Sequence, residues 1–125
     1  MFSPDGSQVA FVRSRDKGGR GIDEGSPPIS ELRVATVGEP SKARLLLRKR
    51  SLLVEPSWDP SGDRLAFIDS PVREIGGPIP EEGDKLMEVN ADGSCLTRIL
   101  SEPGIIISGP AWQPGPDRGA GPILC

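Results

Sequence analysis

Histidine and tyrosine are absent from this 125-residue chain, and aromatic residues make up only 4% of it. Without histidine there can be no Ser–His triad, no imidazole general base and no His-ligated zinc site. The sequence also lacks a GxSxG elbow, a GxxxxGK[ST] phosphate loop and an EF-hand loop. We therefore expect no enzymatic activity, no metal and no cofactor.

Long apolar runs are also missing, since no stretch approaches the roughly 18 apolar residues of a transmembrane helix. We expect no signal peptide in the first residues, because Pro4, Asp5 and Gly6 stand where its apolar core would lie. A net charge of −3 predicts no binding of nucleic acid and no attraction to anionic membranes. Cys95 and Cys125 lack CxxC spacing, so we expect free thiols rather than a disulfide or a metal site.

What the chain does contain is a repeat. The segment FSPDGSQVAFVRS, Phe2–Ser14, aligns without a gap on WDPSGDRLAFIDS, Trp58–Ser70, and a third copy begins at Trp112. The copies start 56 and then 54 residues apart. Self-similarity at such a period predicts an array in which each unit is one supersecondary element. Because Met1 falls inside a unit, we expect the chain to be a piece of a longer protein.

The second half of each unit repeats as well. Arg44–Trp58 reads RLLLRKRSLLVEPSW, and Arg98–Trp112 reads RILSEPGIIISGPAW. The first copy alone could form a helix, but the second has Pro103 and Gly104 in its middle, followed by three isoleucines. Proline and glycine oppose a helix, and β-branched residues favour a strand. Both copies are therefore predicted to be strand, turn and strand.

Alternating apolar residues and turn residues predict a series of short strands. Turns are expected at Asp59–Gly62 and Ala91–Ser94, and long loops at Ser14–Ser30 and Ser70–Asp84. Leu65, Phe67 and Asp69 should share one face of their strand. The expected strands are Gln8–Arg13, Glu31–Val37, Ala43–Leu47, Leu52–Trp58, Arg64–Asp69, Lys85–Asn90 and Leu96–Leu100.

The predicted fold class is all-β. A repeated four-stranded antiparallel sheet is the blade of a β-propeller, and such blades pack face to face on their neighbours. We expect an incomplete propeller of about two blades, spanning 1–51 and 52–104, with the start of a third at 105–125. Large rings recur at one position of the unit and should wedge between blades: Phe2, Trp58 and Trp112.

The motif P-x-W-x-P-x-G-x-x-[LV]-A-F-[VI], followed by L-M-E-V-N-A-D-G-x-x-x-x-R-I-L, resembles the TolB-type β-propeller repeat. The resemblance implies a non-catalytic scaffold that binds a protein, peptide or glycan, a bacterial origin and often a periplasmic or other extracytoplasmic location. The chain departs from the family in its long loops and in holding about two blades rather than six or more. The matching segments are Phe2–Phe11, Leu32–Val37, Pro56–Ile68, Leu86–Leu100 and Pro110–Pro114.

Two alternatives stay open. Similar repeats form the propeller that gates access to prolyl-oligopeptidase-like and tricorn-like serine peptidases, so the chain could be an accessory fragment of such an enzyme. It could also be an inactive gene fragment. A GxSxG domain downstream would favour the peptidase.

Several polar segments could form binding sites, but each has a simpler structural explanation. Lys17–Gly21 could cradle a phosphate but is expected to be a solvated loop. Arg48–Arg50 could contact a small anion or a nucleic acid but is expected to be a charged turn between strands. Glu81, Glu82 and Asp84 could collect Ca²⁺ but are expected to stay solvated. Asp5 and Asp59 are predicted to cap turns rather than to act as acids or bases.

Partners are expected to contact the two longest loops, Arg13–Ser30 and Ser70–Asp84, because long loops in compact folds are commonly functional. An equally open alternative is that both loops are mobile insertions without a function. Two blades also leave open faces and edge strands. Self-association, or the remaining blades, should be needed to cover surfaces that include Val9, Phe11, Leu65 and Phe67.

Overall fold

The computed structural model describes residues 1–15, 29–70 and 83–101, and these residues form two antiparallel sheets without any helix. The first sheet contains three strands and the second contains four, so the all-β prediction is confirmed. The first sheet is made of β1 (Gln8–Arg15), β2 (Ile29–Thr36) and β3 (Glu39–Lys49). The second is made of β4 (Leu52–Trp58), β5 (Arg64–Ser70), β6 (Lys85–Asn90) and β7 (Thr97–Ser101).

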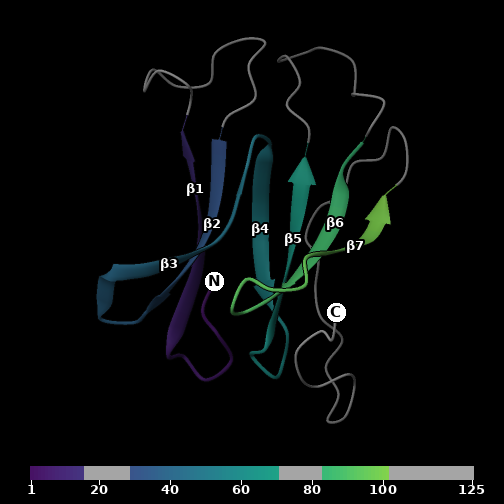
Figure 1. Cartoon of the computed structure of the whole chain (residues 1–125). Coiled ribbons are helices and arrows are strands. Elements are labelled where there is room, and N and C mark those ends of the chain that lie inside the picture. Colours follow the sequence, from purple (N-terminus) through teal and green to yellow (C-terminus); the bar gives the residue numbers. More distant parts are fainter. Residues whose placement is uncertain (16–28, 71–82, 102–125) are drawn as a thin grey trace.

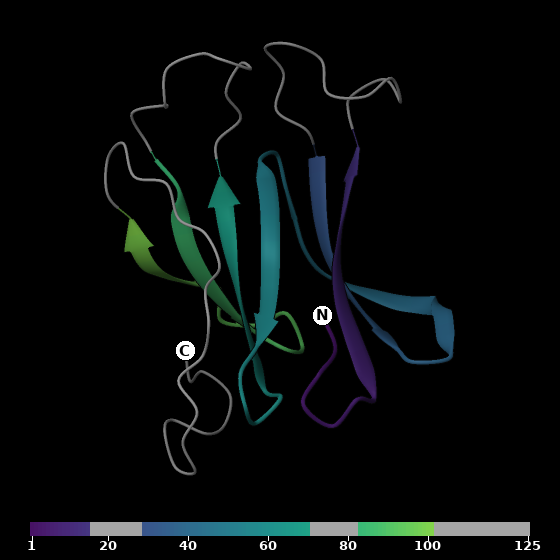
Figure 2. The ribbon, with the colours of Figure 1, turned by 180° about the vertical axis from the view of Figure 1, so that it is seen from behind.

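Both sheets are meanders, in which each strand pairs with the next one along the chain. The two sheets stand side by side, and β4 contacts both β1 and β2 (Figures 1 and 2). Short connections join β2 to β3, β4 to β5 and β6 to β7, because antiparallel neighbours need only a few connecting residues, whereas β1–β2 and β5–β6 pair across long connections. The strand-turn-strand prediction for Arg44–Trp58 is confirmed by β3 and β4. The corresponding prediction beyond Ser101 lies outside the described residues.

The first sheet differs from the predicted four-stranded blade, since β1 is an edge strand. Among the residues that the structure describes, only the first three run beside its outer edge. The backbone of Met1 exchanges hydrogen bonds of 2.8 and 2.9 Å with Ala10, and Phe2 forms one isolated bridge with Val9. Phe2 and Val9 lie 56 positions before Trp58 and Leu65, which pair at the end of β4. The first residues of the sequence therefore lie beside β1 in the place that the end of β4 takes beside β5.

Most predicted strands are present with shifted ends. Lys85–Asn90 and Leu52–Trp58 match β6 and β4, whereas β3 extends further at both ends than the predicted Ala43–Leu47. Ser14, Arg15, Ile29 and Ser30 belong to β1 and β2 rather than to the first loop, because they continue the same pairing.

The core lies between the sheets and is built from the alternate residues of each strand. Leu65 pairs with Val89, and Phe67 pairs with Met87, so these four side chains share the face that meets the first sheet. From the first sheet, Ala10, Leu32 and Val34 complete the cluster. Leu65 and Phe67 are fully buried. They are covered within the chain, so the prediction that they need a partner is wrong.

The side chain of Trp58 lies between the two sheets, in agreement with the predicted wedge. Its side chain packs into the core cluster, and its Nε1 donates to the Met1 carbonyl at 3.0 Å. The aligned Phe2 behaves differently. It is 64% exposed, against 6% for Trp58. The wedge prediction is therefore wrong for Phe2, because no described strand packs on its side of the first sheet; Trp112 lies outside the described residues.

Polar contacts also cross between the sheets. The Lys49 ammonium, at the end of β3, pairs with the Asp69 carboxylate of β5, which is 4% exposed. Arg44 Nη2 donates to the Ala91 carbonyl at 2.8 Å. Gly93, in the turn after β6, has a φ of 92°, and an added Cβ would lie 3.3 Å from the Leu46 carbonyl oxygen. Only glycine combines this backbone angle with so close an approach.

The turn before β1 and the turn before β5 have the same pattern of hydrogen bonds. The serine and the aspartate that form it occupy opposite positions in the two turns. The Ser3 hydroxyl donates to Asp5 Oδ1 at 2.7 Å, and the Ser61 hydroxyl donates to Asp59 Oδ2 at 2.6 Å. In the repeat, Ser3 aligns with Asp59, and Asp5 aligns with Ser61. Ser3 and Asp59 each also accept the backbone N–H of the first residue of the next strand, at 3.0 and 3.1 Å.

We expect Trp58→Ala to lower the free energy of unfolding by ~3–5 kcal/mol, the range for deleting a buried large aromatic side chain. Trp58→Phe keeps most of the ring and loses the indole hydrogen bond, so its loss should be smaller. Urea denaturation followed by circular dichroism measures both. A loss under ~1 kcal/mol for the alanine variant would contradict the position of Trp58 between the sheets.

We expect Lys49→Met to lower the free energy of unfolding by about 1–3 kcal/mol, because the buried Asp69 carboxylate loses its charged partner. Lys42→Met is the matched control. Its side chain is 73% exposed and pairs with the exposed Glu39, so its loss should stay under ~0.5 kcal/mol. Equal losses in the two variants, measured by urea denaturation, would show that the Lys49–Asp69 pair contributes nothing specific.

Candidate functional site

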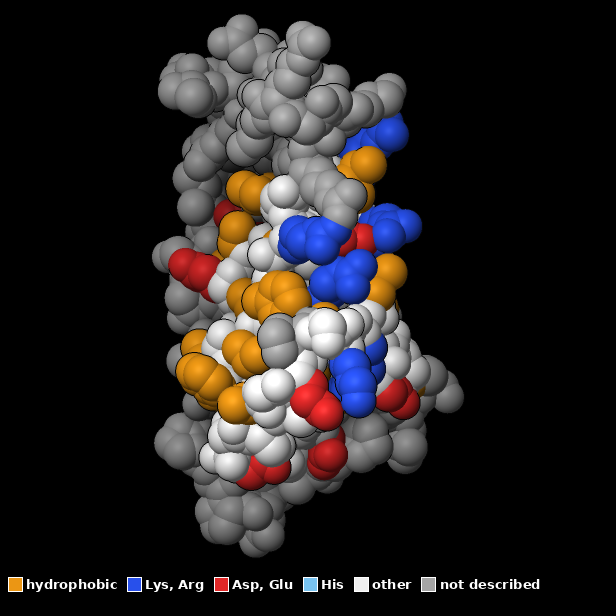
Figure 3. Space-filling model, turned by 90° about the vertical axis from the view of Figure 1, so that its left-hand side faces the viewer, with side chains coloured by type: hydrophobic (Ala, Val, Ile, Leu, Met, Phe, Trp, Pro, Cys, Tyr) orange, Lys and Arg blue, Asp and Glu red, His pale blue; other side chains and the backbone are white. Residues whose placement is uncertain are grey.

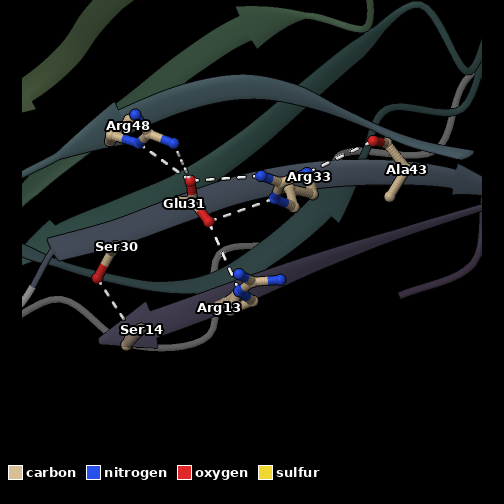
Figure 4. A network of polar contacts seen from close by, with 7 residues as sticks. All are labelled: Arg13, Ser14, Ser30, Glu31, Arg33, Ala43 and Arg48. Carbon is tan, nitrogen blue, oxygen red and sulfur yellow. Dashed lines mark hydrogen bonds and ion pairs between the residues drawn. The ribbon is translucent and has the colours of Figure 1, made fainter. Parts of the chain in front are cut away.

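Four charged residues form a row on the face of the first sheet that points away from the second. Register places Arg13 of β1 opposite Glu31 of β2, and Glu31 opposite Arg48 of β3. Arg33 lies two residues further along β2, on the same face. The alternate residues of β2, such as Leu32, face the core. Strand pairing therefore places Arg13 and Arg48 on either side of Glu31, and Arg33 approaches it along β2 (Figure 4).

The Glu31 carboxylate is surrounded by guanidinium groups. Its Oε2 accepts Arg48 Nη2 at 2.6 Å and Arg48 Nε at 3.0 Å. Arg33 donates to both carboxylate oxygens at 3.4 Å, and Arg13 Nε lies 3.6 Å from Oε1. These hydrogen bonds, from Arg48 first and Arg33 second, lower the pKa of Glu31, and partial burial opposes the shift. Glu31 therefore remains an anion that holds the three arginines in place.

The row, which we call the arginine row (Arg13, Glu31, Arg33 and Arg48), carries three positive charges and one negative charge. Its local charge of +2 contrasts with the net charge of −3 of the chain. Arg13 and Arg48 have side chains that are 46% and 59% exposed. On this side of the molecule, Lys and Arg side chains gather next to hydrophobic ones (Figure 3). Such an arrangement can bind a carboxylate or another anion.

Sequence reasoning found only part of this row. Arg48–Arg50 stood out as three adjacent cations, but the prediction of a charged turn is wrong for two of them. Arg48 and Lys49 lie within β3 and pair with Glu31 and Asp69. Glu31 was not singled out, because its partners depend on strand register. The signal that the sequence offers for Glu31 is the alternation of charged and apolar residues along β2, which indicates a charged outer face.

The other predicted sites contribute little to this surface. Lys17–Gly21, Glu81 and Glu82 lie outside the described residues, as do residues 16–28 and 71–82 of the two predicted binding loops. Asp84 is buried rather than solvated, and it accepts the Ser70 hydroxyl at 2.6 Å. Within the described part of the chain, no group of three or more His, Cys, Asp and Glu residues could hold a metal ion.

Asp5 and Asp59 cap turns, as predicted. Asp5 Oδ1 accepts the Ser7 backbone N–H at 2.9 Å, and Asp59 Oδ1 accepts the Asp63 backbone N–H at 2.9 Å. Hydrogen bonds from the Ser7 backbone, and then from the Ser3 and Ser7 hydroxyls, lower the pKa of Asp5 to about 2. Both carboxylates are thus committed to backbone geometry.

Cys95 forms a disulfide, so the prediction of a free thiol is wrong for this residue. Cys125 lies outside the described residues. Spacing along the sequence does not reveal whether two thiols approach each other, because a disulfide depends on Cα separation and side-chain direction in the folded chain.

Comparison of the chain with models of known protein families and with curated protein sequences gave no match. The similarity to TolB-type repeats therefore stays a prediction. Among residues 1–15, 29–70 and 83–101, no helix is long and apolar enough to cross a membrane.

The stability conferred by Asp5 should depend on pH. Its pKa falls from 3.8 to about 2 on folding, so its contribution is complete above about pH 4 and is lost as the pH falls through 2. Asp5→Asn should therefore be less stable than the natural chain at pH 5, and the difference should shrink towards pH 2. Urea denaturation at both pH values measures it. A difference that is the same at both pH values would contradict the lowered pKa.

Proposed function

We propose that the two sheets are neighbouring blades of a β-propeller and that the chain is a non-catalytic scaffold for a protein, peptide or glycan partner. The observation that carries the proposal is the equivalence of the two sheets. In both, three successive strands pair in the same order. Phe2 pairs with Val9 where Trp58 pairs with Leu65, at a constant offset of 56 residues.

Packing between the sheets also supports the proposal. Propeller blades bury the face of one sheet against the face of the next. Here β4, which lies at one edge of the second sheet, contacts β1 and β2 of the first, and the core cluster draws on both sheets. The shared turn network, with serine and aspartate exchanged, fits two copies of one structural unit.

A binding role fits the chemistry of the chain better than catalysis does. The sequence has no histidine. Of the acidic side chains described above, Glu31 is held by arginines, Asp69 by Lys49, and Asp5 and Asp59 by turn hydrogen bonds. Among the described residues, the arginine row presents Arg13 and Arg48 as exposed cations on one sheet face, where a ligand can reach them. The resemblance to TolB-type repeats points to the same role.

The proposal is tested by screening the full chain against a displayed peptide library and a glycan array. We expect it to retain a specific ligand class and to release those ligands with unchanged mass after prolonged incubation. Mass spectrometry of the released ligands provides the measurement. Cleaved or modified ligands would contradict a non-catalytic scaffold, and so would a complete absence of retained ligands. The Trp58→Ala variant, unfolded in urea, serves as the control for nonspecific retention of ligands.

A further inference from the structure

Glu55 of β4 has a backbone conformation that its side chain disfavours. Its φ is 55°, in the left-handed region. Among the described residues, the only other non-glycine residue with a positive φ is Cys95, which is held by a disulfide. The β-carbon makes this region costly for residues other than glycine, asparagine and aspartate. The next residue is Pro56, and a residue that precedes proline is restricted mainly to extended conformations, so two separate effects strain Glu55.

The strained residue lies in a β-bulge. The register of β4 on β5 shifts between Val54 and Ser57. Within that interval, Glu55 and Pro56 stand opposite a single residue of β5, Phe67. In one common class of bulge, the first of the two residues is a glycine in the left-handed conformation. Glu55 occupies that first position.

The repeat contains the residue that this position favours. Arg44–Trp58 aligns with Arg98–Trp112 at a constant offset of 54 residues, and this offset places Gly109 on Glu55. A proline follows in both copies. Glycine adopts a positive φ without strain. One copy of the segment therefore has the residue that suits the bulge, and the other has a carboxylate in spite of the strain.

The bulge also changes where the side chain of residue 55 lies. Side chains alternate between the two faces of a regular strand, so without the bulge Glu55 would share the face of Leu53. Leu53 is 1% exposed and belongs to the core cluster, whereas Glu55 is exposed. Bulges re-aim side chains and are over-represented next to active sites. The strained backbone thus takes a carboxylate out of the core and presents it at the surface.

Strained backbone conformations cluster at functional sites, where the surrounding structure maintains them. We propose that Glu55 binds a cationic side chain, an arginine guanidinium or a lysine ammonium, on a peptide segment of a partner protein. A carboxylate accepts charge-assisted hydrogen bonds from both groups, and two parallel ones from arginine. The net charge of −3 favours the approach of a basic segment. This inference rests on the proposed scaffold function and names a contact residue and the chemistry of the partner.

A purely structural role for Glu55 makes the opposite prediction for stability. If the side chain served the fold alone, its contacts would outweigh the strain, and replacing it with glycine would destabilise the chain. If the side chain serves a ligand, the unbound chain bears strain that glycine would remove. A residue kept for binding therefore lowers the stability of the free protein.

Urea denaturation of three variants distinguishes these roles. Glu55→Gly should have a higher urea midpoint than the natural chain, because glycine removes the strain. Glu55→Ala keeps the strain and should have a lower midpoint than Glu55→Gly. Glu39 is a matched control, since it is also exposed and lies in a strand without a positive φ, so Glu39→Gly should lower the midpoint. A midpoint of Glu55→Gly at or below that of the natural chain would overturn the proposal.

The binding test uses the full chain and a displayed library of random seven-residue peptides. Peptides retained by the natural chain should share an arginine or lysine at one position, and those retained by Glu55→Gln should lack this preference. Each shared-cation peptide should bind Glu55→Gln at least about tenfold more weakly, as measured by fluorescence anisotropy. Glutamine keeps the size and the backbone strain, so the loss reports the charge. Glu39→Gln should bind as tightly as the natural chain.

Exchange of the cation in the peptide completes the cycle. A peptide with citrulline in place of the arginine, or norleucine in place of the lysine, should bind the natural chain and Glu55→Gln equally. The preference of the cationic peptide for the natural chain should shrink in 1 M salt, since screening acts on exposed charges. A tenfold loss that the neutral peptide shows as well would mean that Glu55→Gln alters the fold, and would overturn the proposal.

The failure of this inference can be told apart from the failure of the proposed function. If retained ligands bind Glu55→Gln as tightly as the natural chain, the contact at Glu55 is wrong and the scaffold function stands. The same conclusion follows if the chain retains glycans but no peptide. If no ligand of either class is retained, the scaffold function is contradicted and this inference fails with it.

Discussion

Burial of one face of each sheet against the other is the constraint on which the rest of this structure depends. Taken alone, the three-stranded and the four-stranded meander would each expose an apolar face to water, which is unfavourable. Packing these faces together buries Leu32 from one sheet and Leu65 and Phe67 from the other completely. Each such side chain contributes about 1.5–3 kcal/mol when it leaves water. The pairing of the sheets is therefore inseparable from the formation of each one.

Polar groups at this interface determine how the sheets are aligned. Hydrophobic contact alone is non-directional, whereas the backbone N–H of Leu53 in the second sheet donates to the buried Ser30 hydroxyl of the first sheet at 3.4 Å. Asp69 likewise pairs with Lys49 of the first sheet, and the indole N–H of Trp58 donates to the Met1 carbonyl beside β1. Sliding one sheet past the other would leave these buried groups without partners, at a cost of about 1–3 kcal/mol each. A small number of buried polar groups therefore determines how the two sheets are aligned.

The repeat made the strands of this fold predictable, because two copies of a segment constrain each other. Pro103 and Gly104 ruled out a helix in the sister copy, and Arg44–Trp58 indeed forms strands. The arginine row could not be predicted in the same way. Its assembly at Glu31 depends on the register of β1 with β2, and a long connection sets no register, unlike a two-residue turn. The disulfide of Cys95 was missed for a related reason, because it too depends on distance in space.

The exchanged serine and aspartate of the two turns have a consequence for how this sequence can vary. Either order completes the network, since one residue supplies the hydroxyl and the other supplies the carboxylate. A turn with two aspartates would bring two negative charges together, and a turn with two serines would lose the stronger charge-assisted hydrogen bonds. The two positions are therefore epistatic: the effect of a substitution at Ser3 has the opposite sign depending on the residue at Asp5. Conversion of one arrangement into the other must pass through a less stable intermediate, so each turn keeps the order that it acquired.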